Sequence, residues 1–280
     1  MKNLKSERQK IFLVGCARSG TTLLQSILAS HHAISSFPET HFLRGTIPKF
    51  WLFQFIKYYG KKEQLFIKKY LKRIKRKELY NAIPNPTFNT LKWVDKIINL
   101  IDLIPNDLDS TIWIEKTPMH LYFIPLIQKV NPNIKYIHMI RDGKDVVASL
   151  FNASQNNPES FGGKQSIENC IKRWKHDIQI HKKYINHDNH FFITYEEIIK
   201  NSNIALKKLC KFLHIEFKEQ MLSFSKMTRE LKFSEENWKP DNSDELKVTK
   251  KFNSIFSEKQ KKYILSQLHD TNINVFKQLG

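Results

Sequence analysis

Short apolar runs alternate with longer amphipathic stretches along most of this chain. Residues 10–15, KIFLVG, are apolar without alternation and end at a glycine, which is typical of a strand buried on both faces of a parallel sheet. Further runs rich in β-branched and aromatic residues have strand length and lie between turn residues. Together these runs predict about five strands, at residues 10–15, 33–37, 111–116, 134–141 and 190–195.

Helical periodicity fills most intervals between these runs. After the loop that follows residue 15, Leu23, Leu24, Ile27 and Leu28 repeat at the spacing of one helix face. Strands that alternate with helices indicate an α/β fold with a doubly wound parallel sheet, in which ligands bind beyond the carboxyl ends of the strands. Further patterns predict helices over residues 121–130, 144–153, 166–185 and 203–214.

The interval between the second and third predicted strands is too long for a simple connection. Residues 57–80 and 91–101 have amphipathic helical patterns, and a hinge rich in Pro and Asn separates them. We therefore expect a single domain spanning residues 1–280, with a helical insertion at about residues 45–108 over the active face. The pattern over residues 257–279 predicts a final helical segment.

The length and composition favour a soluble globular protein. The 280 residues, 41% of them hydrophobic, can bury a substantial core. No run approaches the roughly 18 to 20 uncharged apolar residues of a membrane helix, and the charged start leads directly into a strand. Cys16, Cys170 and Cys210 are widely spaced and match no metal-ligand pattern, so we expect a reduced compartment, the cytoplasm.

A formal net charge of +19 predicts attraction to anions. Only eight of the 46 basic residues are Arg, so in this chain an arginine is a stronger indication of an anion site than a lysine is. Arg18 and Arg141 both stand at the end of an apolar run, close to a glycine. Ten of the 21 residues from 57 to 77 are Lys or Arg, which indicates a solvated face. Contact of this stretch with an acidic acceptor, or peripheral contact with a membrane surface, is the open alternative.

The loop after the first predicted strand has a phosphate-binding frame. Gly15 and Gly20 are five residues apart and precede Thr21 and Thr22, whereas nucleotide triphosphate enzymes have a lysine at the first threonine. Glycines let the backbone approach an oxyanion, and the following helix adds positive potential. We infer a P-loop-like anion site that uses neither a γ-phosphate lysine nor a metal; a purely structural strand-to-helix turn is the alternative.

A second anion site is expected where the fourth predicted strand ends. Arg141 follows this strand, and Ser149 lies eight residues later in a predicted helix. Arg18 with the loop amides would bind one phosphate, and Arg141 with Ser149 a second phosphate on the same ligand, because guanidinium groups match phosphate and sulfate oxygens. Alternatively, Arg141 pairs with Asp142 or Asp145 and Ser149 only packs.

These motifs resemble those of the sulfotransferase family. VGCARSGTTLLQSIL is similar to the family's 5′-phosphosulfate loop, and YIHMIRDGKDVVASL to its 3′-phosphate motif. The family's donor is 3′-phosphoadenosine 5′-phosphosulfate (PAPS), here called the sulfate donor. The resemblance implies donor contacts from Arg18, Ser19, Gly20, Thr21, Thr22, Arg141 and Ser149.

Further segments extend the resemblance to about half the chain. SFPETHFL resembles the segment that presents a glutamate base in the tyrosylprotein and heparan-type branches, which implies this role for Glu39. WIEKTP is similar to the strand end that presents the catalytic lysine, here Lys116. FFITYEEII and WKPDN imply adenosine and nucleotide contacts by Tyr195 and Lys239. The chain departs from the cytosolic small-molecule enzymes, since Pro118 stands where they have a histidine base, and their glycine-rich C-terminal motif is absent.

Plainer interpretations remain open for these residues. Glu39 could stabilise a helix start or pair with Arg44, and His41 and His120 are the reserve candidates for the base. Lys116 could extend from the strand end to solvent. The tyrosine that ends the last predicted strand could belong to the core.

We therefore expect direct in-line transfer of a sulfuryl group from the sulfate donor to a hydroxyl or an amine. Glu39 would take the acceptor proton, while Lys116 and Arg18 stabilise the developing charge. The acceptor would be a small molecule, a glycan or a peptide. Two alternatives are a P-loop kinase that uses ATP and magnesium, and a basic non-enzymatic binding module. A nucleic-acid partner is not expected, because the basic residues match no recognised nucleic-acid motif.

Overall fold

Five parallel strands form one sheet in the computed structural model, which describes residues 8–48, 54, 56–107, 109–231, 233 and 251–278. The strand order is β2-β3-β1-β4-β5, so the first strand is central. Each strand lies within two residues of its expected position, and the predicted parallel sheet is confirmed. The strands are β1 (Gln9–Gly15), β2 (Ile34–Ser36), β3 (Ile112–Lys116), β4 (Lys135–Ile140) and β5 (His190–Thr194).

The central strand is apolar throughout because both of its faces are covered. Ile11 and Leu13 pack into one core with helices α1 (Thr21–Ala29) and α10 (Tyr195–Leu213). Phe12 and Val14 point to the opposite core, as the two-residue alternation of a strand requires. That second core includes residues of α6 (Ile124–Val130), α7 (Gly143–Asn156) and α9 (Ile167–Lys182). The fold is therefore α/β and doubly wound.

Two helix boundaries differ from the expectation. The helix expected at 121–130 begins as a 3-10 turn, η2 (Pro118–Phe123), because Pro118 and Pro125 favour first-turn geometry. The helix expected at 203–214 is the end of α10, which starts eight residues earlier and is interrupted at Asn201. A capping box between Thr194 and Glu197 sets the early start.

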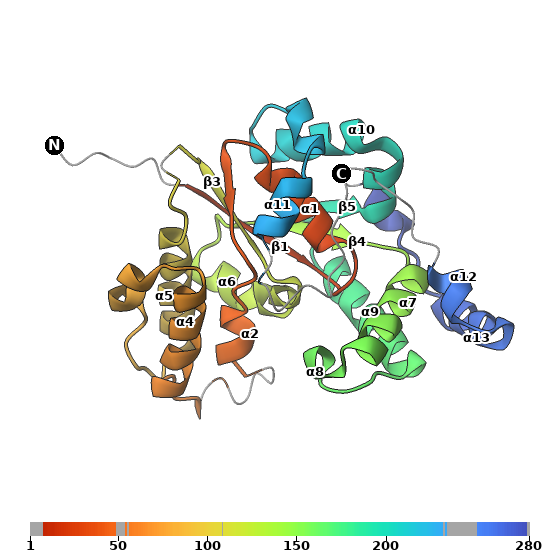
Figure 1. Ribbon diagram of the computed structural model, residues 1–280, viewed down its shortest axis with the longest axis horizontal. Helices are drawn as coiled ribbons and strands as arrows, with labels where there is room; N and C mark the ends of the chain where they lie inside the picture. Colours follow the sequence, from red (N-terminus) through yellow and green to blue (C-terminus); the bar gives the residue numbers. More distant parts are fainter. Residues whose placement is uncertain are drawn as a thin grey trace.

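Helices occupy most of the described chain between β2 and β3. They are α2 (Phe42–Thr46), α4 (Lys61–Arg73), η1 (Lys77–Ala82) and α5 (Thr90–Leu103). The helix expected over residues 57–80 is wrong as one element, since α4 ends at 73 and Lys75 adopts the left-handed conformation before η1. Figure 1 shows α4 and α5 on one side of the sheet, with α2 next to them. We propose that residues 45–108 are an insertion into a single domain.

Residues 251–278 lie at the opposite end of the molecule from α4 and α5 (Figure 1), and buried residues of all these parts belong to the same core. Residues 257–279 form α13 (Glu258–Leu268) and then the 3-10 turn η5 (Asn274–Gln278) instead of one helical segment. No helix in the described ranges is both long and apolar enough to cross a membrane. The remaining short elements are α8 (Pro158–Phe161), η3 (Glu219–Leu222), α11 (Ser225–Glu230) and α12 (Lys251–Ile255).

Candidate active site

The glycine loop joins the carboxyl end of β1 to the start of α1. A Cβ atom on Gly15 would lie 2.6 Å from the carbonyl oxygen of Met139 on β4, so only glycine permits this strand spacing. Gly20 has φ +98°, and a Cβ there would lie 2.6 Å from the Tyr195 ring. Arg18 also has a positive φ of 74°. The loop thus has left-handed backbone at Arg18 and Gly20 directly before the first turn of a helix, a position at which backbone amides can bind an oxyanion.

The two predicted phosphate sites meet at this loop. The Nε–H of Arg18 donates to Oγ of Ser149 over 3.2 Å, and Nη1 of Arg141 donates to the carbonyl oxygen of Arg18 over 3.3 Å. The guanidinium carbon of Arg141 lies 4.1 Å from the centre of the Tyr195 ring, a cation–π contact that orients this nearly buried arginine. Trp174 fixes the backbone of Arg141 from α9 by donating its indole N–H to the carbonyl oxygen.

A third cation, Lys251 of α12, interacts electrostatically with the two arginines. Burial, Arg18 and Arg141 all lower the pKa of Lys251. The pKa of Arg18 is lowered by burial and by Arg141, against the opposing influence of Glu39. A bound anion would stabilise the positive charges of these three side chains. Sequence reasoning missed Lys251 because nothing distinguishes it from the many other lysines of the chain.

The candidate base and the candidate catalytic lysine are in contact. Nζ of Lys116, at the end of β3, lies 2.5 Å from Oε1 of Glu39 and 3.3 Å from Oγ1 of Thr22 in the first turn of α1. The lysine side chain is almost fully buried, so it does not extend to solvent. Nε2 of His41 lies 3.4 Å from Oε2 of Glu39, and burial lowers the pKa of this histidine in spite of the carboxylate.

A second buried carboxylate lies beside this pair. Glu115 accepts hydrogen bonds from Thr40 and Thr117, and Nδ1 of His120 lies 2.7 Å from its Oε2. Both Glu115 and His120 are fully buried. His120, a reserve candidate for the base, is therefore engaged inside the protein with a different carboxylate from Glu39.

The structure brings together the predicted site residues that it describes. Ser19 and Thr21 are buried in the loop and in the first helical turn, beside Gly20 and Thr22. Lys239 lies outside the described residues. The roles assigned to all of these residues stay predictions.

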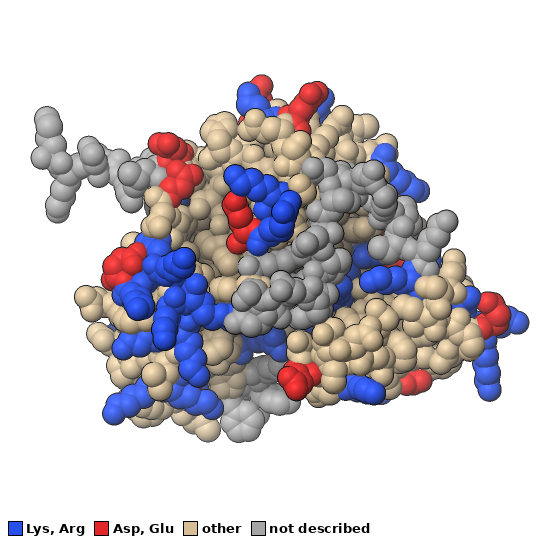
Figure 2. Space-filling view, in the orientation of Figure 1, with Lys and Arg blue, Asp and Glu red and all other residues tan. Residues whose placement is uncertain are grey.

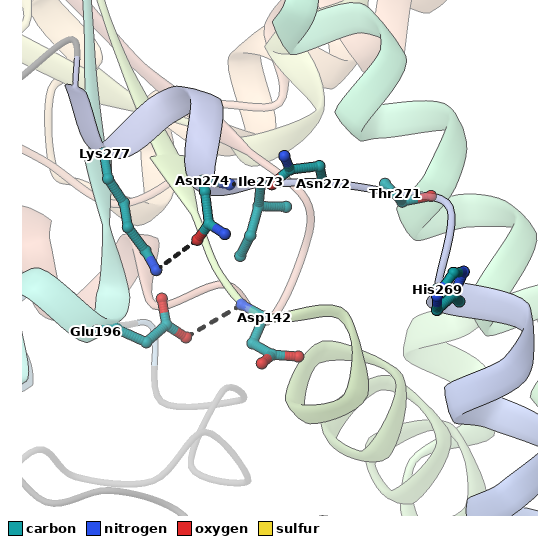
Figure 3. Close-up of a pocket in the computed structure, with 8 residues that line it drawn as sticks. All are labelled: Asp142, Glu196, His269, Thr271, Asn272, Ile273, Asn274 and Lys277. Atoms are coloured by element: carbon teal, nitrogen blue, oxygen red, sulfur yellow. Dashed lines mark hydrogen bonds between the residues drawn. The ribbon is translucent and has the colours of Figure 1, made fainter.

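A polar pocket of about 510 Å³ lies next to two of the predicted site residues, Arg141 and Tyr195. Its lining includes Asp142 and Glu196, the residues directly after Arg141 and Tyr195, and the backbone N–H of Asp142 donates to Glu196 (Figure 3). The remaining wall comes from the segment between α13 and η5 and from Lys277. Among the described residues, no predicted site residue lines this pocket, so the pocket is distinct from the predicted donor site.

Basic side chains gather over part of the insertion on one face of the protein. Figure 2 shows Lys and Arg side chains gathered over α4. This helix exposes basic residues along its outer face, while Ile67, Tyr70 and Leu71 are buried. The basic stretch at 57–77 is thus largely a solvated face, as expected.

Relatives of this chain include a protein-tyrosine sulfotransferase. The chain is 24% identical to the protein-tyrosine sulfotransferase of Drosophila melanogaster over 219 residues, which cover 77% of this chain and 40% of that protein. It is also 24% identical to an uncharacterised protein of Aquifex aeolicus, over 80% of this chain and 28% of that protein. The chain therefore spans less than half the length of these two relatives.

Solved sulfotransferases share the fold. The sulfotransferase domain from the curacin biosynthetic pathway superposes with a TM-score of 0.65 at 19% identity, covering 94% of this chain and 98% of that domain. Mouse sulfotransferase SULT7A1, solved complexed with PAP, gives a TM-score of 0.56 at 18% identity over 99% and 90% of the two chains. A family model described as the sulfotransferase family matches residues 10–219, three quarters of the sequence. The chain belongs to the sulfotransferase family.

Proposed function

We propose that this protein transfers a sulfuryl group from PAPS to a hydroxyl, or less favourably an amine, of an acceptor. One observation carries the proposal: Arg18 donates to Ser149 and accepts from Arg141, so the two predicted phosphate sites share residues at the end of the glycine loop. A ligand with two separate phosphate groups on one adenosine matches that arrangement. The PAP complex of the mouse family member supports the same donor class.

The loop and its cations would hold the sulfate donor. The amides of the loop, with Ser19, Gly20, Thr21 and Thr22, bind the 5′-phosphosulfate, while Arg141 and Ser149 bind the 3′-phosphate. Lys251 adds charge between these groups, and Tyr195 packs near the adenosine. Lys239 keeps its predicted nucleotide contact as part of the proposal.

Transfer is direct and in line. The acceptor hydroxyl loses its proton to Glu39 as its oxygen bonds to sulfur, and the bond from sulfur to the bridging phosphate oxygen breaks, releasing 3′,5′-bisphosphoadenosine. Lys116 and Arg18 stabilise charge on the bridging oxygen and the sulfuryl group, the electrostatic contribution that dominates many enzymes. The 2.5 Å contact between Lys116 and Glu39 supports a shared reaction centre.

The acceptor is a small molecule, a glycan or a peptide held near α2 and the insertion helices. The relatives named as protein-tyrosine sulfotransferases make a peptide hydroxyl one candidate. The cytoplasm remains our proposed location; Cys16, Cys170 and Cys210 are all free thiols, as a reduced compartment requires.

A thermal-shift titration tests the donor assignment. We expect 3′,5′-bisphosphoadenosine to raise the melting temperature without magnesium, because a ligand that binds only the folded state stabilises it. Arg141→Ala should abolish most of the shift, whereas Arg229→Ala, which removes an exposed arginine of α11, should leave it intact. A larger, magnesium-dependent shift with ATP would favour the kinase alternative and contradict the proposal.

A further inference from the structure

Glu115 makes an unusual number of contacts for a fully buried carboxylate. Its Oε1 atom accepts from the backbone N–H of Thr40 at 3.2 Å, from the Thr40 hydroxyl at 2.9 Å and from the Thr117 hydroxyl at 2.6 Å. Nδ1 of His120 lies 2.7 Å from Oε2. Burial alone would raise the pKa of Glu115, but His120 and the two hydroxyls reverse the shift and lower this pKa below its ordinary value.

These contacts determine the direction of every hydroxyl bond around the carboxylate. Each threonine has one hydroxyl proton, and both protons point to Glu115. The two oxygens are then left as acceptors: Thr117 accepts the backbone N–H of His41 at 3.2 Å, and Thr40 accepts the backbone N–H of Phe42 at 3.3 Å. Three consecutive backbone amides, 40 to 42, are therefore held by Glu115 or by hydroxyls that Glu115 orients.

The segment held in this way adjoins the candidate base. Glu39 directly precedes Thr40, and Lys116 directly follows Glu115. Because side chains alternate along a strand, Glu115 and Lys116 point to opposite sides of the β3 end, so Glu115 does not compete for the ammonium group. His41, which begins α2, has a left-handed backbone without a side-chain cap of its own. The backbone bonds of the segment thus depend on the Glu115 cluster.

We propose that Glu115 is a positioning residue: its buried carboxylate fixes the backbone of residues 40–42 so that Glu39 stays beside Lys116. The inference rests on the proposed function for the chemistry of Glu39, but the arrangement of the segment is independent of it. Displacement of a reacting group by about 1 Å can reduce turnover by about 100-fold, so a positioning residue has a measurable effect without touching the acceptor.

Hydrogen exchange of the backbone amides tests the positioning directly and needs no ligand. The amides of Ile11 and Leu13 in β1 report global opening and serve as the reference. In Glu115→Leu we expect the protection factors of amides 40–42 to fall at least about tenfold more than those of the reference amides. Glu115→Gln keeps the Oε1 acceptor and should restore most of the protection. If Glu115→Leu fails to fold, Thr117→Val, which removes one oriented hydroxyl, carries the test.

Thr228→Val is the matched control. Thr228 of α11 is also fully buried, and its hydroxyl donates to the Phe224 carbonyl, outside both the Glu115 cluster and residues 40–42. This change should lower global protection without a selective loss at residues 40–42. Equal protection at these amides in wild type, Glu115→Leu and Thr117→Val would overturn the inference.

Turnover separates this inference from the proposed function. With labelled PAPS and an accepted phenol or sugar, Glu115→Leu should lower kcat by about 10- to 100-fold while the affinity for 3′,5′-bisphosphoadenosine stays unchanged. Glu115→Gln should recover most of the rate. If amide protection at residues 40–42 is selectively lost but the rate is unchanged, Glu115 positions the segment as inferred, but Glu39 is not the base.

Discussion

Lys116 and Glu39 approach each other to 2.5 Å from the ends of neighbouring strands, and a threonine of the glycine loop contacts the same ammonium group. The pair therefore joins the candidate base to the candidate anion cradle. An ammonium group near a carboxylate favours the charged form of both. This arrangement keeps a proton acceptor and a positive charge at the same edge of the sheet, where an acceptor hydroxyl and a sulfuryl group would meet.

Replacement of Glu39 by glutamine should separate proton abstraction from donor binding. The amide cannot accept the acceptor proton, so we expect kcat to fall by about two to four decades with little change in bisphosphate affinity. Transfer of labelled sulfate to an accepted hydroxyl compound and calorimetric titration with 3′,5′-bisphosphoadenosine measure the two quantities. A Glu39→Gln enzyme that keeps half the wild-type rate would rule out the assignment.

Lys251 should contribute to donor affinity although it belongs to no recognised motif. Removal of its charge in Lys251→Ala should weaken bisphosphate binding several-fold, and the loss should shrink at high salt because the interaction is electrostatic. Lys259→Ala removes an exposed lysine from α13 and serves as the control. The same dissociation constant for both variants would show that Lys251 does not contact the donor.

Gly20→Ala should disturb the donor site through Tyr195. The new methyl group would meet the tyrosine ring that stacks on Arg141, in addition to the cost of about 1 to 2 kcal/mol for a left-handed alanine. Gly162→Ala has the backbone cost alone, because φ is +69° and no atom lies within 4 Å of its Cβ. Urea unfolding and bisphosphate titration should therefore show an affinity loss only for Gly20→Ala. Parallel effects of the two changes would exclude a role for the Tyr195 contact.

A chain of buried histidines should make stability sensitive to mild acid. His138 contacts His181 and His190 at 2.7 Å through its two ring nitrogens. Burial is the main cause that lowers the pKa values of His181 and His190 to about 3, against an ordinary value near 6.5. The neutral rings thus contribute stability that is fully present above about pH 6.5 and is lost as the pH falls toward 3.

Each of these two histidines should lower the free energy of unfolding by about 2 kcal/mol at pH 5 relative to pH 7.5. His181→Phe should reduce that pH dependence by about this amount, and His269→Asn, at an exposed position, should not. Urea unfolding at the two pH values measures the difference. Equal pH dependence in wild type and His181→Phe would mean that the buried ring is protonated in the native state.

The sheet and most of the candidate site follow from local patterns. Buried parallel strands are short and uniformly apolar, so a run such as Ile11 to Val14 can be recognised as a strand from the sequence. The predicted site residues lie at strand ends. Because the strands are parallel, the sequence positions of Gly15, Lys116 and Arg141 are enough to place them at one edge of the sheet.

Other features depend on tertiary contacts or on local signals other than the apolar pattern. Lys251 reaches the site from a separate helix, and no local pattern distinguishes it from the solvated lysines. Glu115 is part of the WIEKTP motif, but only the fold shows that it is fully buried and surrounded by donors. The early start of α10 did have a local signal, the Thr194 and Glu197 capping box. The left-handed Lys75 that ends the long predicted helix has no such signature.

The central position of β1 has a consequence for the assembly of the chain. Gln9 pairs with Ile112, and every strand-to-strand contact of this sheet joins segments that are distant in sequence. Because loop closure must precede such pairings, we expect slow folding in comparison with helical proteins of similar size. The proposed nucleotide site combines residues that follow β1, β4 and β5, so we expect bisphosphate binding to recover during refolding only when these strands have joined, and its recovery would report completion of the sheet.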